Sequence, residues 1–213
     1  MFEDEWNTKN EIVKSRLKNL LGIYGETIYA RKCEVKALAS KESKDFFNTT
    51  HIQGNTQSSI RYGLFYGGSL VAAMSFGHRR KITNAKRIDG EYELLRFSTK
   101  IGCHVIGGAG KLLAHFERTQ KDLKTLLSYA DMRWSAGKLY GALGFTLDHI
   151  SEPNYWYMDS HCSHRMYRYA FRKSILPKML KSFDKDKTEM ENMVANGFNV
   201  IWDCGNYVFV KRY

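Results

Sequence analysis

The sequence predicts a single α/β domain, of the α+β kind, with a mixed central sheet and helices on both of its faces. Two strand-like runs, 60–66 and 69–76, are joined by Gly67 and Gly68, which suit a two-residue hairpin turn because glycine tolerates positive φ. Further along, a strand leads through the glycine-rich turn 107–110 directly into a helix. An antiparallel hairpin followed by alternating strands and helices is typical of a mixed sheet.

Length and composition indicate one globular domain. The 213 residues suffice for one well-buried core and would divide awkwardly into two ordinary domains. Apolar residues make up 43% and charged residues 26%, which excludes a disordered chain. The 33 Lys and Arg against 22 Asp and Glu give a formal charge of +11, and this balance favours polyanions such as nucleic acid.

The remaining elements follow from apolar periodicity and from turn residues. An amphipathic helix is expected over 6–21, a strand over 28–35 and a helix from Ser40 to Phe47. Further expected elements are strands at 92–98, 123–130 and 155–158 (the last core strand), helices after 107–110 and at 135–143 and 189–195, and a hairpin of 198–202 with 207–210. They divide the domain into an N-terminal helical arm (1–28), a core (29–160) and a basic C-terminal extension (161–213) that ends in the hairpin.

Other classes of protein do not fit the sequence. Residues 3–5 are acidic where a signal peptide needs positive charge, and no apolar run reaches the roughly 20 residues that cross a bilayer, so we expect a cytoplasmic protein. The four cysteines form no CxxC pair, which argues against a zinc ribbon and against disulfides. His161, Cys162 and His164 resemble half of a metal site without a second half, so no metal is expected.

The glycine-rich turn is a candidate phosphate site. At the start of a helix the first N–H groups lack partners and the macrodipole is positive, so a phosphate binds if no side chain blocks its approach. A tight connection that needs positive φ would use the same glycines. The turn is neither a Walker loop nor a Rossmann fingerprint, which leaves the pyrophosphate of coenzyme A as a strong candidate. The residues that would bind it are His104, Val105, Ile106, Gly107, Gly108, Ala109, Gly110 and Lys111.

Two motifs resemble those of the GNAT superfamily of N-acyltransferases. His104 to Ala109 looks like its pyrophosphate loop, Gln/Arg-x-x-Gly-x-Gly/Ala, except that His104 replaces the usual Gln or Arg, so that a phosphate contact from this side chain is not implied. Tyr140 to Phe145 is similar to the Tyr-x-x-x-Gly-Phe that closes the next helix of that family. The resemblance covers about residues 31–158. It implies an acyltransferase whose acetyl-CoA, or another acyl-CoA, lies in a splay between two parallel strands.

Four residues are candidates for the chemistry. In that family the tyrosine of the second motif often protonates the departing thiolate, and the resemblance implies this role for Tyr140; the alternative is a packing residue with its hydroxyl at the surface. The attacking amine must lose a proton, and the candidate acceptors are His51, Glu93 and Asp131. Each acceptor has an ordinary alternative: a loop histidine for His51, a solvated or salt-bridged face for Glu93, and a helix cap or salt bridge for Asp131.

A finer resemblance concerns one branch of the superfamily. A His near the first helices, the segment Ser128-Tyr129-Ala130-Asp131-x-Arg133-x-Ser135 and the Tyr140 helix together look like Mom-type phage DNA-modification proteins, and like domains attached to phage HNH-type endonucleases. The ending 201–206 is similar to those phage proteins as well. This resemblance implies transfer of a small acyl-derived group to an adenine amine in double-stranded DNA, in the cytoplasm of a host, as an anti-restriction activity. The chain carries no HNH or GIY-YIG signature of its own, so cleavage is not implied.

Basic residues gather in two segments, 77–87 and 161–181. In the second segment Lys and Arg are interleaved with aromatic residues and no acid occurs. Phosphate contacts plus aromatic faces favour a nucleic-acid groove, and a solvated basic face is the alternative. The candidate nucleic-acid contacts are Arg79, Arg80, Lys81, Arg133, Arg165, Arg168, Arg172 and Lys173.

Two other functions stay open on the sequence. One is a GNAT-shaped DNA-binding module without turnover, associated with phage endonucleases. The other is a transferase that acetylates proteins or small amines. Both a monomer and a homodimer stay open as well.

Overall fold

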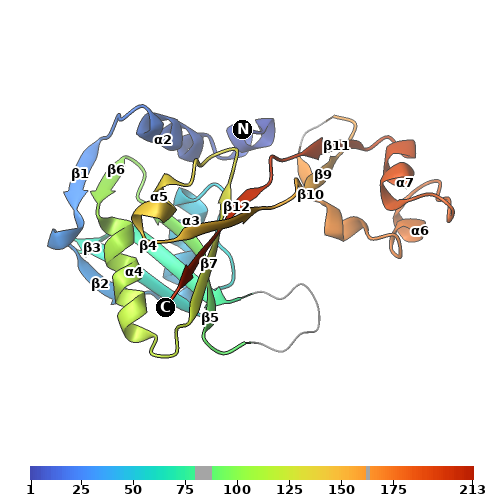
Figure 1. Ribbon diagram of the computed structural model, residues 1–213. Helices are drawn as coiled ribbons and strands as arrows, with labels where there is room; N and C mark the ends of the chain where they lie inside the picture. The colour runs from blue at the N-terminus through green and yellow to red at the C-terminus, as the bar shows by residue number, and fades with distance from the viewer. Residues whose placement is uncertain (80–87, 162–163) are drawn as a thin grey trace.

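The computed structural model describes residues 1–79, 88–161 and 164–213, and it confirms a mixed α/β architecture (Figure 1). The central sheet contains β2 (Glu34–Ala37), β3 (Ile60–Tyr66), β4 (Ser69–His78), β5 (Glu91–Thr99), β7 (Thr125–Asp131), β8 (Thr146–Ile150) and β12 (Asn206–Arg212). Their order across the sheet is β2-β3-β4-β5-β7-β12-β8. All neighbours are antiparallel except β5 and β7, which are parallel. A parallel pair needs a crossover connection, and α4 (Gly108–Thr119) lies within it.

The predicted hairpin of β3 and β4 is confirmed. Its turn consists of Gly67 and Gly68 with φ of 56° and 79°, in the left-handed region that residues with a Cβ seldom adopt. Tyr66 and Ser69 pair directly across this turn. The two glycines therefore fix where the register of the hairpin begins.

Helices cover both faces of the sheet, as the sequence predicts. On one face α4 buries Leu112 and Phe116, and the ring of Phe116 stacks on that of Phe76 with centroids 3.8 Å apart. On the other face α3 (Ser40–Thr50) packs the fully buried Phe47 against Ala73. The main core therefore lies between α4 and the sheet, and a smaller apolar cluster lies under α3.

Two elements predicted near the N-terminus are interrupted in the structure. The helix expected over 6–21 forms α1 (Glu3–Thr8) and α2 (Asn10–Leu20), because Lys9 lies outside helical geometry at φ −133° and ψ 35°. The strand expected over 28–35 forms β1 (Glu26–Tyr29), a 3-10 turn η1 (Ala30–Lys32) and β2. β1 leaves the central sheet and pairs in parallel with β6 (Cys103–Ile106).

Two predictions for the end of the chain are wrong. A separate sheet contains β9 (Tyr155–Met158), β10 (Arg165–Tyr167) and β11 (Asn199–Trp202). β9 is therefore not the last core strand, and β11 forms no hairpin with β12. β12 instead enters the core between β7 and β8. Val208, Phe209 and Val210 are all buried, and apolar residues on both faces of a strand are accommodated at the centre of a sheet rather than in a surface hairpin.

Residues 151–205 form an inserted lobe, and Figure 1 shows it projecting from the core. Besides its sheet, the lobe contains η2 (Arg168–Phe171), α6 (Leu176–Met179) and α7 (Glu189–Ala195). Tyr157, Leu176 and Met193 lie in its own apolar core. The two ends of the lobe, residues 151–154 and 203–205, form its neck. There the carboxylate of Asp203 accepts hydrogen bonds from the backbone N–H of Asn154 at 2.7 Å and of Gly205 at 2.8 Å. The basic segment after His161 is thus part of an insertion, and the chain returns to the core after it.

The remaining expectations concern a membrane span, the basic loop and a metal site. No helix in the described parts of the chain has the length and apolar character that a bilayer span requires. Arg80 and Lys81, of the predicted basic loop, and Cys162, of the candidate metal cluster, lie outside the described residues. Among the residues that the structure does describe, no group of at least three His, Cys, Asp or Glu could hold a metal ion.

The neck of the lobe generates the first prediction. Gly205 has φ of +77°, and a Cβ added to it would lie 2.3 Å from the carbonyl oxygen of Ser151. Gly205→Ala should therefore lower the free energy of unfolding, measured by chemical denaturation, by about 2–5 kcal/mol, through backbone strain and overpacking. The matched control is Gly197→Ala, where φ is +84° and no atom lies within 4 Å, so strain alone should cost about 1–2 kcal/mol. Equal losses would contradict a tight neck.

Candidate active site

The site begins where β5 and β7 separate. The two strands pair from Glu91 with Thr125 as far as Leu94 with Ser128. Beyond that point β5 stays paired with β4 and β7 stays paired with β12, so the sheet opens between them. A cavity of about 280 Å³ lies there, lined by the second half of β5, the end of β7, α2, the segment after α3, and α5 (Lys138–Ala142). The splay between two parallel strands that the GNAT resemblance implies is therefore present.

Tyr140 lies in this cavity and is held from several sides. Its ring stacks on Phe209 with centroids 4.6 Å apart and meets the edge of Phe145. Its hydroxyl is 3.1 Å from Oγ of Ser128, which also donates to the carbonyl of Leu94 at 3.0 Å. Ser128 has one proton, which it donates either to this carbonyl or to the Tyr140 hydroxyl, and in both cases Tyr140 keeps its own proton. Burial raises the pKa of Tyr140, so the phenol keeps a proton that it can give.

His51 also lines the cavity, but it is poorly suited to removing a proton. Burial, and then the positive charges of Arg96, Arg16 and Lys9, lower its pKa to about 3. Its Nδ1 accepts the backbone N–H of Gln53 at 3.2 Å. A neutral imidazole whose Nδ1 accepts must carry its proton on Nε2. His51 therefore acts as a hydrogen-bond donor, and the predicted role as a base is not supported.

Asp131 lines the cavity but is already engaged. Its Oδ1 accepts from Nε and the backbone N–H of Arg133, and its Oδ2 accepts from Nη2 at 2.6 Å. Arg133 is only 9% exposed and also donates to Glu5. This pairing matches the salt bridge that was the alternative on the sequence. It favours a structural role for Asp131, and Arg133 is equally unavailable to a nucleic acid.

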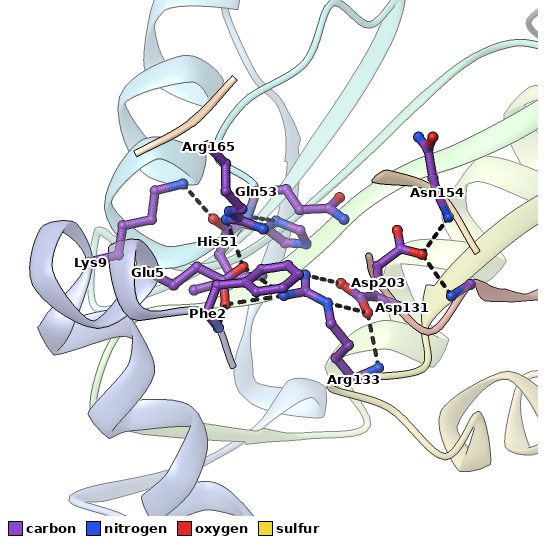
Figure 2. A network of polar contacts seen from close by, with 12 residues as sticks. Phe2, Glu5, Lys9, His51, Gln53, Asp131, Arg133, Asn154, Arg165 and Asp203 are labelled. Carbon is purple, nitrogen blue, oxygen red and sulfur yellow. Dashed lines mark hydrogen bonds and ion pairs between the residues drawn. The ribbon is translucent and has the colours of Figure 1, made fainter. Parts of the chain in front are cut away.

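A network of charges connects this site to the lobe (Figure 2). Arg165, from β10, donates to Asp4 and Glu5 at 2.9 and 3.1 Å. The ring of Phe2 lies between two guanidinium groups, 4.0 Å from that of Arg165 and 4.1 Å from that of Arg133. Burial opposes ionisation of Glu5, but the N–H of Phe2 and both guanidinium charges hold its pKa below the ordinary value. Arg165 therefore links the lobe to α1 through ion pairs with Asp4 and Glu5.

Glu93 lies outside the cavity. It is on β5 opposite Leu127, in the half where β5 and β7 are still paired, and it does not line the cavity as far as the described residues show. Burial raises the pKa of Tyr129, and the charge of Glu93 raises it further. The geometry thus gives no support to Glu93 as the base.

The glycine-rich turn provides a cradle of backbone groups. Gly107 precedes α4 with φ of 75°, and no side chain caps the helix there. The first backbone hydrogen bond of α4 runs from Lys111 to Gly107, which leaves the N–H groups of Gly108, Ala109 and Gly110 without helical partners in the described chain. A Cβ on Gly110 would lie 3.9 Å from Leu143, directly after α5. The cradle therefore lies beside the helix that carries Tyr140.

The side chains around the cradle are occupied elsewhere. His104 stacks on Tyr24 with ring centroids 4.1 Å apart. Nζ of Lys111 donates to the carbonyls of Ala30 and Cys33 at 2.9 and 2.6 Å. Val105, Gly108 and Ala109 are buried, and Ile106 is exposed. Any phosphate at this turn would be held by backbone N–H groups rather than by these two side chains.

Reasoning from the sequence missed most of the residues that line the cavity, among them Arg16, Arg96 and Trp134. Arg96 donates to the carbonyls of Gly54 and Leu95, at 2.9 and 2.7 Å. A signal for Arg16 did exist, because it lies four positions after Ile12 and so shares the buried face of the predicted helix. No comparable signal marked Trp134, which follows β7 in an irregular segment.

Comparisons with known proteins find solved structures with a distant similarity to this chain. No protein-family model matches the chain, and no curated protein matches it. A GNAT family acetyltransferase from Elizabethkingia anophelis with acetyl-CoA bound is 12% identical, with TM-score 0.46, over 85% of this chain and 99% of that one. Naa50 from Arabidopsis thaliana, in complex with a bisubstrate analogue, is 13% identical, with TM-score 0.45, over the same shares. A Bacillus subtilis acetyltransferase in complex with CoA is 14% identical, with TM-score 0.46, again over 85% and 99%. At these values the similarity carries no conclusion about activity.

The low pKa of His51 generates the second prediction. An unfolded histidine binds a proton below about pH 6.5, whereas folded His51 does so only near pH 3. Between these limits the unfolded state binds more protons, so the free energy of unfolding falls as the pH falls. His51→Gln removes this contribution. Its melting temperature should therefore decline less steeply than that of wild type between about pH 7 and pH 4.

The control for this measurement is His161→Gln, at an exposed position of the lobe. Its melting temperature should follow the wild-type slope. If His51→Gln also follows the wild-type slope, the buried neutral state of His51 is refuted.

Proposed function

We propose that the chain is an acyl-CoA-dependent N-acyltransferase of the GNAT type that acts on amino groups of DNA bases. The observation that carries the proposal is the separation of β5 and β7 after Leu94 and Ser128, with Tyr140 in the resulting cavity. The glycine cradle at the start of α4 lies beside α5 and suits the pyrophosphate of the donor. The sequence motifs around Gly107 and Tyr140 point to the same donor.

The chemistry assigned to the cavity is aminolysis of a thioester. The nitrogen of the acceptor attacks the carbonyl carbon, the C–S bond breaks, and the sulfur leaves as the thiolate of CoA. Tyr140 gives its proton to that sulfur and takes back the proton that the nitrogen loses when the amide forms. The raised pKa of Tyr140 keeps the phenol protonated before the reaction.

The acceptor that fits this cavity is an amine that arrives uncharged. Among the described cavity residues, Asp131 is paired with Arg133 and His51 has a pKa of about 3, so neither suits removal of a proton from an ammonium group. A lysine ammonium, with an ordinary pKa of about 10.4, would also meet the positive charges of Arg16 and Arg96. The exocyclic amine of a nucleobase is already neutral. This favours DNA over proteins and small alkylamines.

The lobe offers the surface on which DNA would lie. Tyr167 and Tyr169 are each 53% exposed, and Arg172 and Lys173 are exposed beside them. Arg168 stacks over Tyr169, its guanidinium carbon 5.2 Å from the ring centroid. Cationic groups next to open aromatic faces suit both phosphates and an unstacked base. A base in a duplex would have to be flipped out to reach Tyr140.

The other basic candidates are less available. Arg79 forms an ion pair with Glu91 at 3.0 Å. Arg133 and Arg165 are largely buried, and both form ion pairs with acidic residues of α1. We therefore assign the contact to the lobe. A Mom-like role in phage anti-restriction is the biological setting that we propose for this activity.

A second function, binding of DNA without turnover, is favoured by one observation. The side chains of His104 and Lys111 contact Tyr24 and the carbonyls of Ala30 and Cys33, so neither is free for a phosphate. The two functions differ in one measurement. An acyltransferase should be stabilised by acetyl-CoA, and a binding module should melt at the same temperature with and without it.

The third prediction concerns catalysis. Tyr140→Phe keeps the stacking on Phe209 and removes only the proton donor, so turnover should fall on the order of a hundredfold while the melting temperature stays close to wild type. Acylated nucleosides from DNA incubated with the protein and acetyl-CoA would be measured by mass spectrometry. Tyr207→Phe, which packs against the same core outside the cavity, is the control and should keep its activity. An unchanged rate in Tyr140→Phe would make this residue a packing residue.

The fourth prediction concerns DNA binding by the lobe. Replacing Arg172 and Lys173 together with Ala should weaken binding to duplex DNA at low salt. It should also reduce the slope of log affinity against log salt by roughly one for each lost phosphate contact. The matched control replaces the exposed Lys41 and Lys44 of α3, which removes the same charge elsewhere. If both double variants change the slope equally, binding depends on net charge and not on the lobe.

A further inference from the structure

Arg16 is a cation inside the cavity that lacks a counter-ion. Its guanidinium carbon lies 5.0 Å from the centroid of the Trp134 ring. It forms no hydrogen bond or ion pair with any residue that the structure describes, and its Nε is buried without a partner. The indole N–H of Trp134 is likewise buried without a partner. Two donors of one cavity are thus unsatisfied, although unpaired buried polar groups are uncommon in folded proteins.

Two other arginines near this site, Arg133 and Arg165, form ion pairs with carboxylates. Arg133 is 9% exposed and donates to both Glu5 and Asp131. Arg165 is 15% exposed and donates to Asp4 and Glu5. These two arginines, which link distant parts of the chain, thus both have carboxylates of the chain as partners. Of the described arginines that line the cavity, Arg96 donates to two backbone carbonyls, whereas Arg16 has neither a carboxylate nor a carbonyl as a partner.

The surroundings of Arg16 leave positive charge uncompensated. Burial lowers the pKa of Arg16, but a guanidinium does not deprotonate in a protein. Asp131 and Glu5 act on it through space, yet both are hydrogen bonded to Arg133. Arg96 also lines the cavity, and His51 beside it is neutral with a proton to donate. A partly desolvated cation in such surroundings is costly until an anion reaches it.

We propose that Arg16 binds an anionic oxygen group of a substrate in this cavity. Two sources carry that chemistry in the proposed function, on which this inference rests. One is a carboxylate at the end of the transferred acyl group. The other is a phosphate of the acceptor nucleotide. Arg16 would hold either through charge-assisted hydrogen bonds, with the Nε2 proton of His51 as a further donor in the same cavity.

Matched pairs of probes distinguish the two sources. Malonyl-CoA and butyryl-CoA have acyl groups of similar size, and only the first carries a carboxylate. Deoxyadenosine 5′-phosphate and deoxyadenosine differ only in the phosphate. Dissociation constants for these four compounds would be measured by calorimetry with wild type, Arg16→Gln and Arg16→Lys. Malonate and inorganic phosphate, tested alone by thermal shift, report on the subsite without any thioester.

In wild type, the anionic member of one pair should bind at least about tenfold more tightly than its neutral counterpart. Arg16→Gln should bring this ratio close to one, and Arg16→Lys should restore part of it because it keeps the charge. A ratio near one for both pairs in wild type would overturn the proposal. So would a ratio that persists in Arg16→Gln.

Stability of the free protein separates ligand binding from a structural role. Arg16→Gln removes an uncompensated charge and should not lower the melting temperature. Arg133→Gln leaves Glu5 and Asp131 without their partner and should lower it clearly. A large loss in Arg16→Gln would instead assign Arg16 to packing on Trp134, against the proposal.

Failure of the proposed function has a different signature. If neither CoA thioester binds wild type, the acyltransferase assignment fails. The small anions and the nucleotide pair then still decide the subsite, because they require no donor. If malonate and phosphate shift the melting temperatures of wild type and Arg16→Gln equally and the nucleotide pair shows no preference, the anion subsite is refuted as well.

Discussion

β5 and β7 run parallel at the middle of an otherwise antiparallel sheet, and the site depends on this one pairing. Each strand also has an outer antiparallel partner, and it keeps that partner to its end while the shared ladder stops at Leu94 and Ser128. The two halves of the sheet can therefore separate without either strand losing all its hydrogen bonds. Side chains satisfy exposed carbonyls in the gap, as Ser128 does for Leu94 and Arg96 does for Leu95. Hydrogen bonds within the chain thus satisfy backbone groups at the opening.

Two acidic side chains of α1, which lies near the cavity, are paired with arginines outside the cavity lining. The acids of α1 are used by arginines that come from two distant parts of the chain, Arg133 after β7 and Arg165 in the lobe. Phe2 fills the space between these two guanidinium groups, so an aromatic ring and two carboxylates offset positive charge at the same place. The described lining of the cavity thus combines cations, a neutral histidine, a protonated phenol and Asp131, whose charge is paired with Arg133. Such a composition suits a neutral nucleophile and an anionic group better than it suits an ammonium ion.

Local signals in the sequence predicted the parts of the fold that local chemistry determines. The turn at Gly67 and Gly68 and the left-handed Gly107 before α4 needed glycine, and both were found. The place of β12 was not predictable in this way, because its partners lie far away in the sequence and Tyr207 follows β11 so closely that a hairpin looked natural. His51 was found as a candidate, but its low pKa results from burial and then from the charges of Arg96, Arg16 and Lys9, all of which depend on the fold. Arg16 shares a helical face with Ile12, but the prediction used only the apolar residues of that face and so missed this arginine.

The lobe leaves the core and returns to it at neighbouring positions. β8 and β12 are adjacent antiparallel strands, and Ser151 and Asn206 exchange hydrogen bonds where the lobe departs. In the order of the core strands, the whole lobe therefore occupies the position of a hairpin loop, and the entropic cost of closing such a loop grows only slowly with its length. Among the described residues, none that lines the cavity belongs to the lobe, which contacts α1 through Arg165. In the proposed function, the surface that recognises the acceptor and the residues that carry out the transfer therefore belong to separate segments of the chain.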